Sequence, residues 1–335
     1  MSGEGISGSG GAVSGRSYWA DHTRELRRAL RKAVPGEVLR ELHQRRAWAH
    51  FLVLAWQLLL LFGAGIVAFR GGSWIWIPAS VVVGLTIFNF TVMLHEVVHG
   101  TVFRSRRPRA TEFLRHLYAF PSGISGTQFT RWHLDHHAQL GDPEADPKRH
   151  WLSPKRNARW FKALYLTPAL IPIYFRAARS ETASYPPETR RAIRRERTLT
   201  ILGHLAILAG LAIAGGPFAA LRAYLVPVLV VFPVAFTVNR LGQHYDIVPE
   251  NPALWGSVLR PSRVRDVAFL WSAYHLEHHY FPGVPFYNLR ALHVRLRPFF
   301  AKVGAGETTY ARLLWNWFGR NRPPHADWRR AAAVR

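Results

Sequence analysis

Four long segments of the chain contain no charged residue and consist mostly of apolar side chains. They are residues 51–69, 74–94, 198–214 and 223–238. A helix that spans a bilayer needs about 20 apolar residues, with a usual range of about 17–25. The first two segments meet that length, and the last two lie near its lower limit. Only short glycine-containing turns separate the members of each pair, so the pattern predicts an all-α integral membrane protein with four transmembrane helices in two hairpins.

The sequence before the first span predicts a tail followed by surface helices. Residues 1–16 are rich in Gly and Ser and contain no apolar run, which predicts a disordered N-terminal tail. Residues 17–335 are expected to form a single domain that contains all four spans. At its start, residues 17–50 have the pattern of basic amphipathic helices, and Pro35-Gly36 predicts a break between them.

Three further helices are expected outside the spans. Residues 164–175 are apolar but short, and Pro168 and Pro172 interrupt them, so they predict an interfacial helix rather than a fifth crossing. Helical patterns also cover residues 264–274 and 289–300. These segments are expected to contribute to a helical cap at one membrane face.

The distribution of charge predicts which face that is. The chain carries 44 Lys and Arg residues against 20 Asp and Glu residues, a formal net charge of +24. Of the basic residues, only Arg70 and Arg222 lie in the two hairpin turns, and the other 42 lie at the opposite ends of the spans. By the positive-inside rule, the termini and the cap are therefore expected in the cytoplasm. Anionic lipid headgroups explain the basic balance, so no nucleic-acid partner is expected.

Histidine gives the chemical signal of the chain. Eight of its 17 histidines fall into three short clusters with the spacing HxxxH, HxxHH and HxxHH. Helix positions three and four apart share a face, so each cluster can direct its imidazoles at one point. Eight imidazoles are too many for one tetrahedral zinc ion, which predicts two metal ions or one unusually crowded ion. The clustered residues are His95, His99, His133, His136, His137, His275, His278 and His279.

Other features limit the chemistry of this site. The chain contains no cysteine, so thiolate metal sites, intrinsic iron–sulfur clusters and disulfides are excluded. Carboxylates that adjoin a cluster are expected to orient its imidazoles. The candidates are Glu96, Asp135, Asp142, Asp146 and Glu277. Histidines outside the clusters, such as His293, are expected to be structural or exposed.

The three clusters, in this order and membrane layout, resemble the histidine boxes of the membrane fatty acid desaturase superfamily. The similarity extends from about Arg46 to Phe300 and includes the residues that follow the second and third boxes. Within the superfamily, Pro121-Ser122-Gly123-Ile124 and Gln243-His244-Tyr245 are similar to the sphingolipid desaturase branch.

The resemblance implies two non-haem iron ions that activate O2 and a reaction that forms a double bond in an acyl chain. It implies that the eight clustered histidines are the metal ligands, and that His244 is a ninth. Some members also use an asparagine, four residues before that histidine, through a water molecule. Arg240 occupies that position here. Asn239 lies one residue earlier, so it is a candidate for the water-mediated role at a position shifted by one residue.

Three alternatives remain open at the level of sequence. Hydroxylases and ketolases of lipid or hydrocarbon substrates share the three boxes with desaturases. His95-Glu96-Val97-Val98-His99 also matches the HExxH motif of zinc metalloproteases, in which the glutamate activates water. A metal transporter would place histidines or aspartates inside the spans, where only His204 lies.

The electrons for O2 activation are expected to come from a separate protein. The sequence lacks the His-Pro-Gly-Gly motif of a fused cytochrome b5 and has no cysteine for a cluster. A ferredoxin with its reductase, or a separate cytochrome b5, is therefore the expected donor. An acidic carrier would be attracted to the basic cytoplasmic face.

Overall fold

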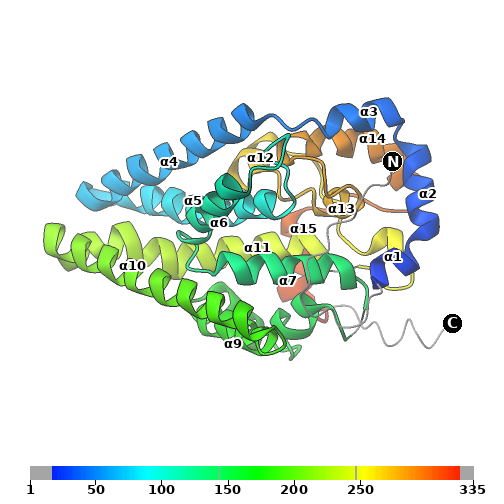
Figure 1. The fold of residues 1–335 in the computed structure, drawn as a ribbon. Coiled ribbons are helices and arrows are strands. Elements are labelled where there is room, and N and C mark those ends of the chain that lie inside the picture. The colour runs from blue at the N-terminus through cyan, green and yellow to red at the C-terminus, as the bar shows by residue number, and fades with distance from the viewer. Residues whose placement is uncertain (1–16, 143, 246, 325–335) are drawn as a thin grey trace.

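The computed structural model describes residues 17–142, 144–245 and 247–324 (Figure 1). The regular elements in these ranges are all helical, and the only β-type pairing among them is an isolated bridge between Leu259 and Thr308. The prediction of an all-α fold is therefore confirmed for this part of the chain. The tail predicted at residues 1–16 lies outside the described residues.

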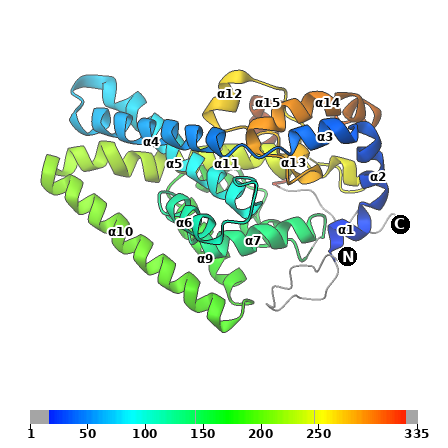
Figure 2. The same ribbon diagram turned by 45° about the horizontal axis from the view of Figure 1, so that its top comes forward.

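The first predicted hairpin consists of α4 (Ala47–Arg70) and α5 (Trp76–Val98), joined by a 3-10 turn at Ser73–Ile75. The two helices lie side by side in Figures 1 and 2. Each is long and apolar enough to cross a membrane. They differ in burial, because α5 packs inside the molecule whereas α4 exposes large apolar side chains such as Leu52 and Phe62. Such a surface is stable only against lipid or another apolar partner.

The second predicted hairpin lies within one continuous helical stretch, Pro187–His244, which is the third segment long and apolar enough to span a membrane. It begins with α10 (Pro187–Ala220), continues through π-helical turns and ends with α11 (Phe232–His244). Gly216 interrupts it with φ 78°, a conformation that favours glycine, and Pro217 follows. Figure 2 shows the chain reverse at the far end of α10 and return along α11. The predicted spans 198–214 and 223–238 lie on either side of this reversal.

Shorter helices gather at the other end of the long ones (Figure 1). Before the first hairpin these are α1 (Tyr18–His22), α2 (Arg24–Ala33) and α3 (Gly36–Leu42). Between the hairpins lie α6 (Pro108–Ala119), α7 (Gly126–Gln139), α8 (Arg159–Ala163) and α9 (Leu170–Thr182). After α11 come α12 (Arg263–Ala268), α13 (His275–Tyr280), α14 (Leu289–Lys302) and α15 (Tyr310–Leu314).

The N-terminal helices cover the core from one side. The helices α2 and α3 meet at Val34-Pro35, which confirms the predicted break, and both pack on α14. Leu30 is 2% exposed and Leu42 is 8% exposed, so the apolar face of this segment is part of the main core. The arginines on the opposite face remain at the surface, as expected for amphipathic helices.

Two of the shorter predicted helices differ in length from the structure. The helix expected at 264–274 ends at Ala268, because Leu270 and Trp271 adopt positive φ values of 43° and 57° and turn the chain toward α13. The helix expected at 164–175 is shifted to α9, where Pro172 lies in the first turn and interrupts no helical hydrogen bond. At 13 residues, α9 is too short to cross a bilayer.

Candidate metal centre

Four helix segments direct histidines at one place in the molecule. The first box occupies the last turn of α5, the second lies on α7, and the third forms most of α13. His244 is the last residue of α11. Five box histidines, including His133, His136 and His278, are at most 5% exposed. Sequence segments more than 100 residues apart therefore converge in a buried cluster.

The nine predicted histidines form two groups in which the ring nitrogens lie within 4.8 Å of one another. The first group contains five residues: His95, His99, His133, His137 and His278. The second group contains four residues: His136, His244, His275 and His279. The rings of His137 and His279 stack with centroids 4.1 Å apart, so the two groups are in direct contact.

Each HxxHH box is divided between the two groups. On α7, His133 and His137 belong to the first group, and His136 belongs to the second. On α13 the division is reversed, because His278 joins the first group. Residues four apart lie nearly above one another on a helix, whereas the third histidine of each box is rotated away from that pair. One helix can therefore supply ligands to two separate points.

Hydrogen bonds around the second group determine where its protons lie. The backbone oxygen of Trp255 can only accept, and it lies 2.7 Å from Nδ1 of His244, so that nitrogen carries the proton. Nδ1 of His136 likewise faces the Asp146 carboxylate at 2.8 Å. The two Nε2 atoms, which then carry lone pairs, lie 3.1 Å apart. Two lone pairs at this distance repel one another, and a cation between them would turn the repulsion into coordination.

The same crowding occurs across the cluster. Nε2 of His99 lies 2.7 Å from Nε2 of His133, and Nε2 of His244 lies 2.8 Å from Nε2 of His275. Burial lowers the pKa of His133, His136 and His275 well below its usual value, and neighbouring positive charge such as that of Lys148 contributes. These imidazoles are therefore neutral, which is the form that binds metal ions. The donor set fits two metal ions with nitrogen ligands.

One of the predicted carboxylates supports a box histidine directly. Asp146 is 5% exposed, and its Oδ1 accepts from His136 Nδ1 and, over 3.0 Å, from the backbone N–H of Lys148. Nζ of Lys148 lies 3.0 Å from Nδ1 of His133. Burial and the nearby Arg240 lower the pKa of Lys148 to about 7. The segment after the second box therefore contacts one histidine of each group, through Asp146 on His136 and Lys148 on His133.

The other candidate carboxylates have different partners. Glu96 accepts from the Thr101 hydroxyl at 2.6 Å and from the Phe286 backbone at 3.0 Å, which joins the first box to the loop after the third. Its other oxygen is 3.6 Å from His95 Nδ1. Glu277 Oε1 accepts from Nδ1 of His293, 2.5 Å away and fully buried.

Two of the candidates lie away from the histidine rings. Asp135 faces Arg131 at 3.9 Å and bonds to Tyr185. Asp142 accepts from the backbone of Glu144 and Ala145 and thus stabilises a turn. Neither has a recorded contact with a box histidine among the described residues, so the structure gives both a local role.

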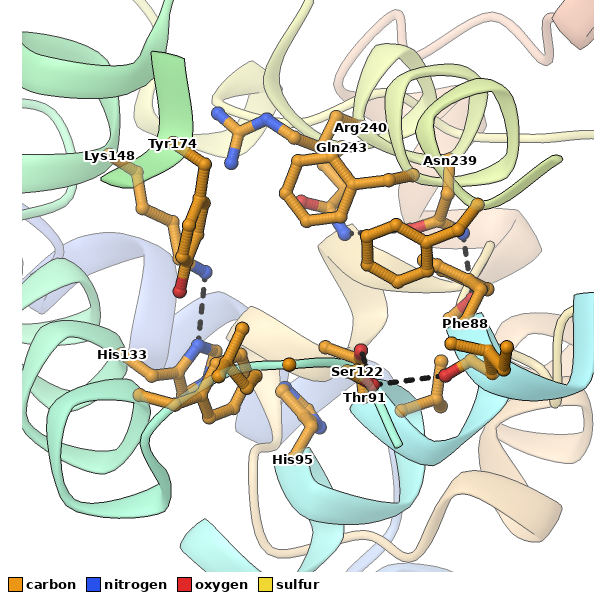
Figure 3. Close-up of a pocket in the computed structure, with 18 of the residues that line it drawn as sticks. Phe88, Thr91, His95, Ser122, His133, Lys148, Tyr174, Asn239, Arg240 and Gln243 are labelled. Carbon is orange, nitrogen blue, oxygen red and sulfur yellow. Dashed lines mark hydrogen bonds between the residues drawn. The ribbon is translucent and has the colours of Figure 1, made fainter. Parts of the chain in front are cut away.

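Asn239 and Arg240 lie in the wall of a cavity beside the histidines (Figure 3). Asn239 donates to the Ser272 hydroxyl at 2.7 Å and accepts from Gln243 at 3.0 Å. No recorded bond joins Asn239 to a box histidine among the described residues. Asn239 therefore lies in the cavity wall and is hydrogen-bonded to Gln243, the residue that precedes His244 at the end of α11.

The cavity has a volume of about 220 Å³ and is bordered by four box histidines from both metal groups. Most of its wall is apolar, and Phe88, Phe232 and Phe236 contribute to it. Thr91 donates to the Ser122 hydroxyl at 2.8 Å and supplies one of the few polar points on the side opposite Lys148 (Figure 3). Its lining suits a hydrocarbon chain whose C–H bonds reach the metal centre.

Comparison with known proteins agrees with this geometry. The fatty acid desaturase family model matches residues 71–311, which contain the three boxes and His244. This chain belongs to the fatty acid desaturase family. The chain is also 25% identical, over 309 residues, to the human sphingolipid delta(4)-desaturase/C4-monooxygenase DES2 (Homo sapiens). That alignment covers 88% of this chain and 87% of the human protein.

Family membership favours lipid oxidation over the protease and transporter alternatives, and both desaturase-type and hydroxylase-type reactions agree with it. This family member is a membrane oxidoreductase that acts on lipids, and the resemblance inferred from the histidine boxes is confirmed. The protease alternative is wrong, and the structure gives a physical reason: Glu96 is 2% exposed and engaged by Thr101 and Phe286. A glutamate held in this way is not free to activate water. The transporter alternative is likewise superseded.

Sequence reasoning missed two residues at this site. Lys148 contacts His133, yet in the sequence it is an ordinary basic residue in a polar loop. His293 is 0% exposed and supports Glu277, as a structural histidine would. Proximity of Lys148 to the second box is a weak signal, and no local pattern connects His293 with a glutamate 16 residues earlier.

Proposed function

We propose that this desaturase uses two iron ions and O2 to introduce a double bond into the acyl chain of a fatty acid or lipid. The observation that carries the proposal is the division of nine neutral, crowded imidazoles into two adjoining groups beside an apolar cavity. One ion would be held by His95, His99, His133, His137 and His278. The other would be held by His136, His244, His275 and His279. Imidazole ligands suit iron, and a bound pair would supply the redox chemistry that activates O2.

The surrounding residues would orient the ligands and exclude water. Asp146 fixes the ring of His136, and the Trp255 carbonyl fixes that of His244. The apolar cavity would hold the reacting part of the chain. A larger apolar groove of about 620 Å³, between α4, α5 and α10, shares Ile87 and Val228 with the cavity. Because the two spaces adjoin at these residues, the groove would give the rest of a long acyl chain a place at the level of the bilayer.

We further propose that the chain crosses the membrane four times, as two hairpins, with the cap, metal centre and termini in the cytoplasm. The reversal at Gly216 supports this, because it divides the stretch Pro187–His244 into two antiparallel arms. The charge distribution supports the orientation, since only Arg70 and Arg222 lie at the hairpin turns. Arg222 donates to the backbone oxygens of Phe69 and Gly71, so the two turns meet at the same end.

The electron donor would be a separate ferredoxin with its reductase, or a cytochrome b5. The absence of cysteine from the whole sequence supports an external donor. The formal net charge of +24 favours an acidic carrier at the basic face. We expect electron transfer from such a carrier to weaken as ionic strength rises, because exposed charges are screened.

Hydroxylation is the second candidate reaction. It is favoured by the human relative, whose name records both desaturase and C4-monooxygenase activities. The two outcomes share the site and the oxidant, and they differ in whether a hydroxyl group is added or a second hydrogen is removed. A ketolase reaction would be a further oxidation of the hydroxylated product.

Lipid analysis of an expression host tests the proposal. Wild type should produce lipids that are two mass units lighter, and a gain of 16 mass units would instead identify hydroxylation. His136→Ala should produce neither while still inserting into the membrane, and His116→Ala, at an exposed site on α6, is the matched control. Two irons per chain are expected in purified protein. An active preparation with one zinc ion and negligible iron contradicts the di-iron assignment.

A further inference from the structure

Two basic side chains line the same part of the cavity wall, and the proposed chemistry does not use them. Lys148 and Arg240 both border the 220 Å³ cavity, and both also border a smaller cavity of about 70 Å³ beside His136 and His244. They therefore stand on the wall that the two cavities share. Figure 3 shows Arg240 and Lys148 on the same side of the open space, away from Phe88 and Thr91.

Among the described residues, no carboxylate forms a hydrogen bond or ion pair with the guanidinium of Arg240, although the charge of Asp146 acts on it. No hydrogen bond or ion pair joins it to another of the described residues, and its recorded neighbour is the ring face of Phe236 at 5.8 Å. Asp146, the acid whose charge acts on it, already accepts from His136 and from the Lys148 backbone. An arginine presents five N–H donors, and leaving them unused in an apolar wall is costly.

The electrostatic surroundings favour an incoming anion. The two histidine groups lie beside this wall, and the metal ions proposed for them would add positive charge. Guanidinium pairs with carboxylate and phosphate oxygens in a bidentate geometry, and a lysine amine adds a further N–H donor. The apolar lining of the larger cavity requires that the anion carry a hydrocarbon chain.

We propose that Arg240 and Lys148 bind the anionic head group, a carboxylate or a phosphate, of the acyl substrate. This inference rests on the proposed function and specifies its substrate class. Arg240 supplies the permanent charge and the bidentate geometry. Lys148 supplies a second donor on the side of His133. A neutral alcohol or amide head group would leave the guanidinium without a partner and would bind more weakly.

The position of the pair also restricts the reacting carbon. Lys148 Nζ is 3.0 Å from one ring nitrogen of His133, and the other nitrogen of that ring faces the metal group. A head group held by Lys148 is thus separated from the centre by about one imidazole ring. Oxidation should therefore occur within the first several carbons of the chain, and the remainder should extend past Phe88 toward the groove between the long helices.

Binding measurements that need no turnover test this assignment. Radiolabelled hexadecanoate, hexadecyl phosphate and hexadecanol share one chain and differ in head group. Their affinities would be measured for purified protein in phosphatidylcholine nanodiscs, with empty discs as the blank. Wild type should bind an anion at least about tenfold more tightly than hexadecanol. The stronger of the two anions identifies the head group, and equal affinities for all three ligands overturn the proposal.

Variants then show whether these residues are responsible. Arg240→Gln and Lys148→Met should each lose most of the preference for the anion and keep the affinity for hexadecanol. Lys302→Met, at an exposed position at the end of α14, should behave as wild type. An unchanged preference in the Arg240→Gln/Lys148→Met double variant refutes the assignment.

A milder variant covers the case in which Arg240→Gln disturbs the cavity and loses all three ligands. Arg240→Lys keeps the charge and removes the bidentate geometry, so its preference for the anion should fall below that of wild type. A preference equal to wild type overturns the role of Arg240. Failure of the proposed function would appear separately, as missing iron or missing product, and would leave these binding differences measurable.

Discussion

Removal of His293 tests how the third histidine box is held in place. Its Nδ1 donates to Glu277 Oε1 over 2.5 Å, and both side chains are 0% exposed. Glu277 stands between His275 and His278 on α13, so this bond joins the helix that carries the third box to α14. The sequence predicts that histidines outside the boxes are structural or exposed, and the structure shows that His293 is buried and structural.

The magnitude follows from the burial of the pair. His293→Ala leaves the Glu277 carboxylate enclosed without its donor, and removing one partner of a buried pair typically costs about 3–5 kcal/mol. Native domains have net stabilities of only about 5–15 kcal/mol, so this is a large share. For a chain of 335 residues it corresponds to a fall of about 4–7 °C in the unfolding midpoint.

Thermal unfolding of detergent-purified protein, followed by tryptophan fluorescence, measures the effect. His116→Ala is the matched control, because His116 is 48% exposed and pairs with Glu112 at the surface, where such a pair contributes at most about 1 kcal/mol. Adding Glu277→Gln to His293→Ala should recover part of the loss, since it removes the buried charge. Equal midpoints for His293→Ala and His116→Ala would refute the reasoning.

Four further results are expected. His244→Ala should lower iron content and abolish activity as severely as His136→Ala, and full iron content with normal turnover would remove His244 from the centre. Asp146→Asn should reduce activity about 10–100-fold because the ring of His136 loses its anionic partner; unchanged kinetics would assign Asp146 to the turn alone. In this cysteine-free chain, a cysteine at Ser153 should be labelled only from the cytoplasmic side and one at Ser73 only from the other, so that labelling of both from one side contradicts the four-span arrangement. Removal of metal by a chelator should lower the unfolding midpoint, since ions that bind only the folded state stabilise it, and an unchanged midpoint argues against bound metal.

The long helices could be predicted closely because their signal is local. The apolar runs at 51–69 and 74–94 lie inside α4 and, apart from its first residues, α5, and the glycines at 215–216 mark the observed reversal. The spacing of the boxes likewise predicts that their histidines converge, but the expectation that each box directs its imidazoles at one point is wrong for the two HxxHH boxes, because each divides its histidines between two groups. The end of α12 could not be predicted, because two residues without special sequence preference, Leu270 and Trp271, adopt positive φ there.

The partners of the histidines were harder to predict than the histidines themselves. Asp135 is adjacent to His136 in sequence, yet neighbouring residues on a helix point about 100° apart, and its carboxylate faces Arg131. Asp146 is ten residues away and makes the bond. The assignment of each histidine to one of two groups depends on how α7 and α13 are rotated against each other. That rotation is set by packing over the whole fold.

The division of each HxxHH box between two groups has a consequence for mutagenesis. Because α7 and α13 each carry histidines of both groups, neither proposed metal position can shift without moving the helices that define the other. A substitution that displaces the histidines of one group should therefore also displace histidines of the other group. Loss of activity in a single-histidine variant therefore cannot assign that residue to one ion, and only separate measurements of the occupancy of each position can.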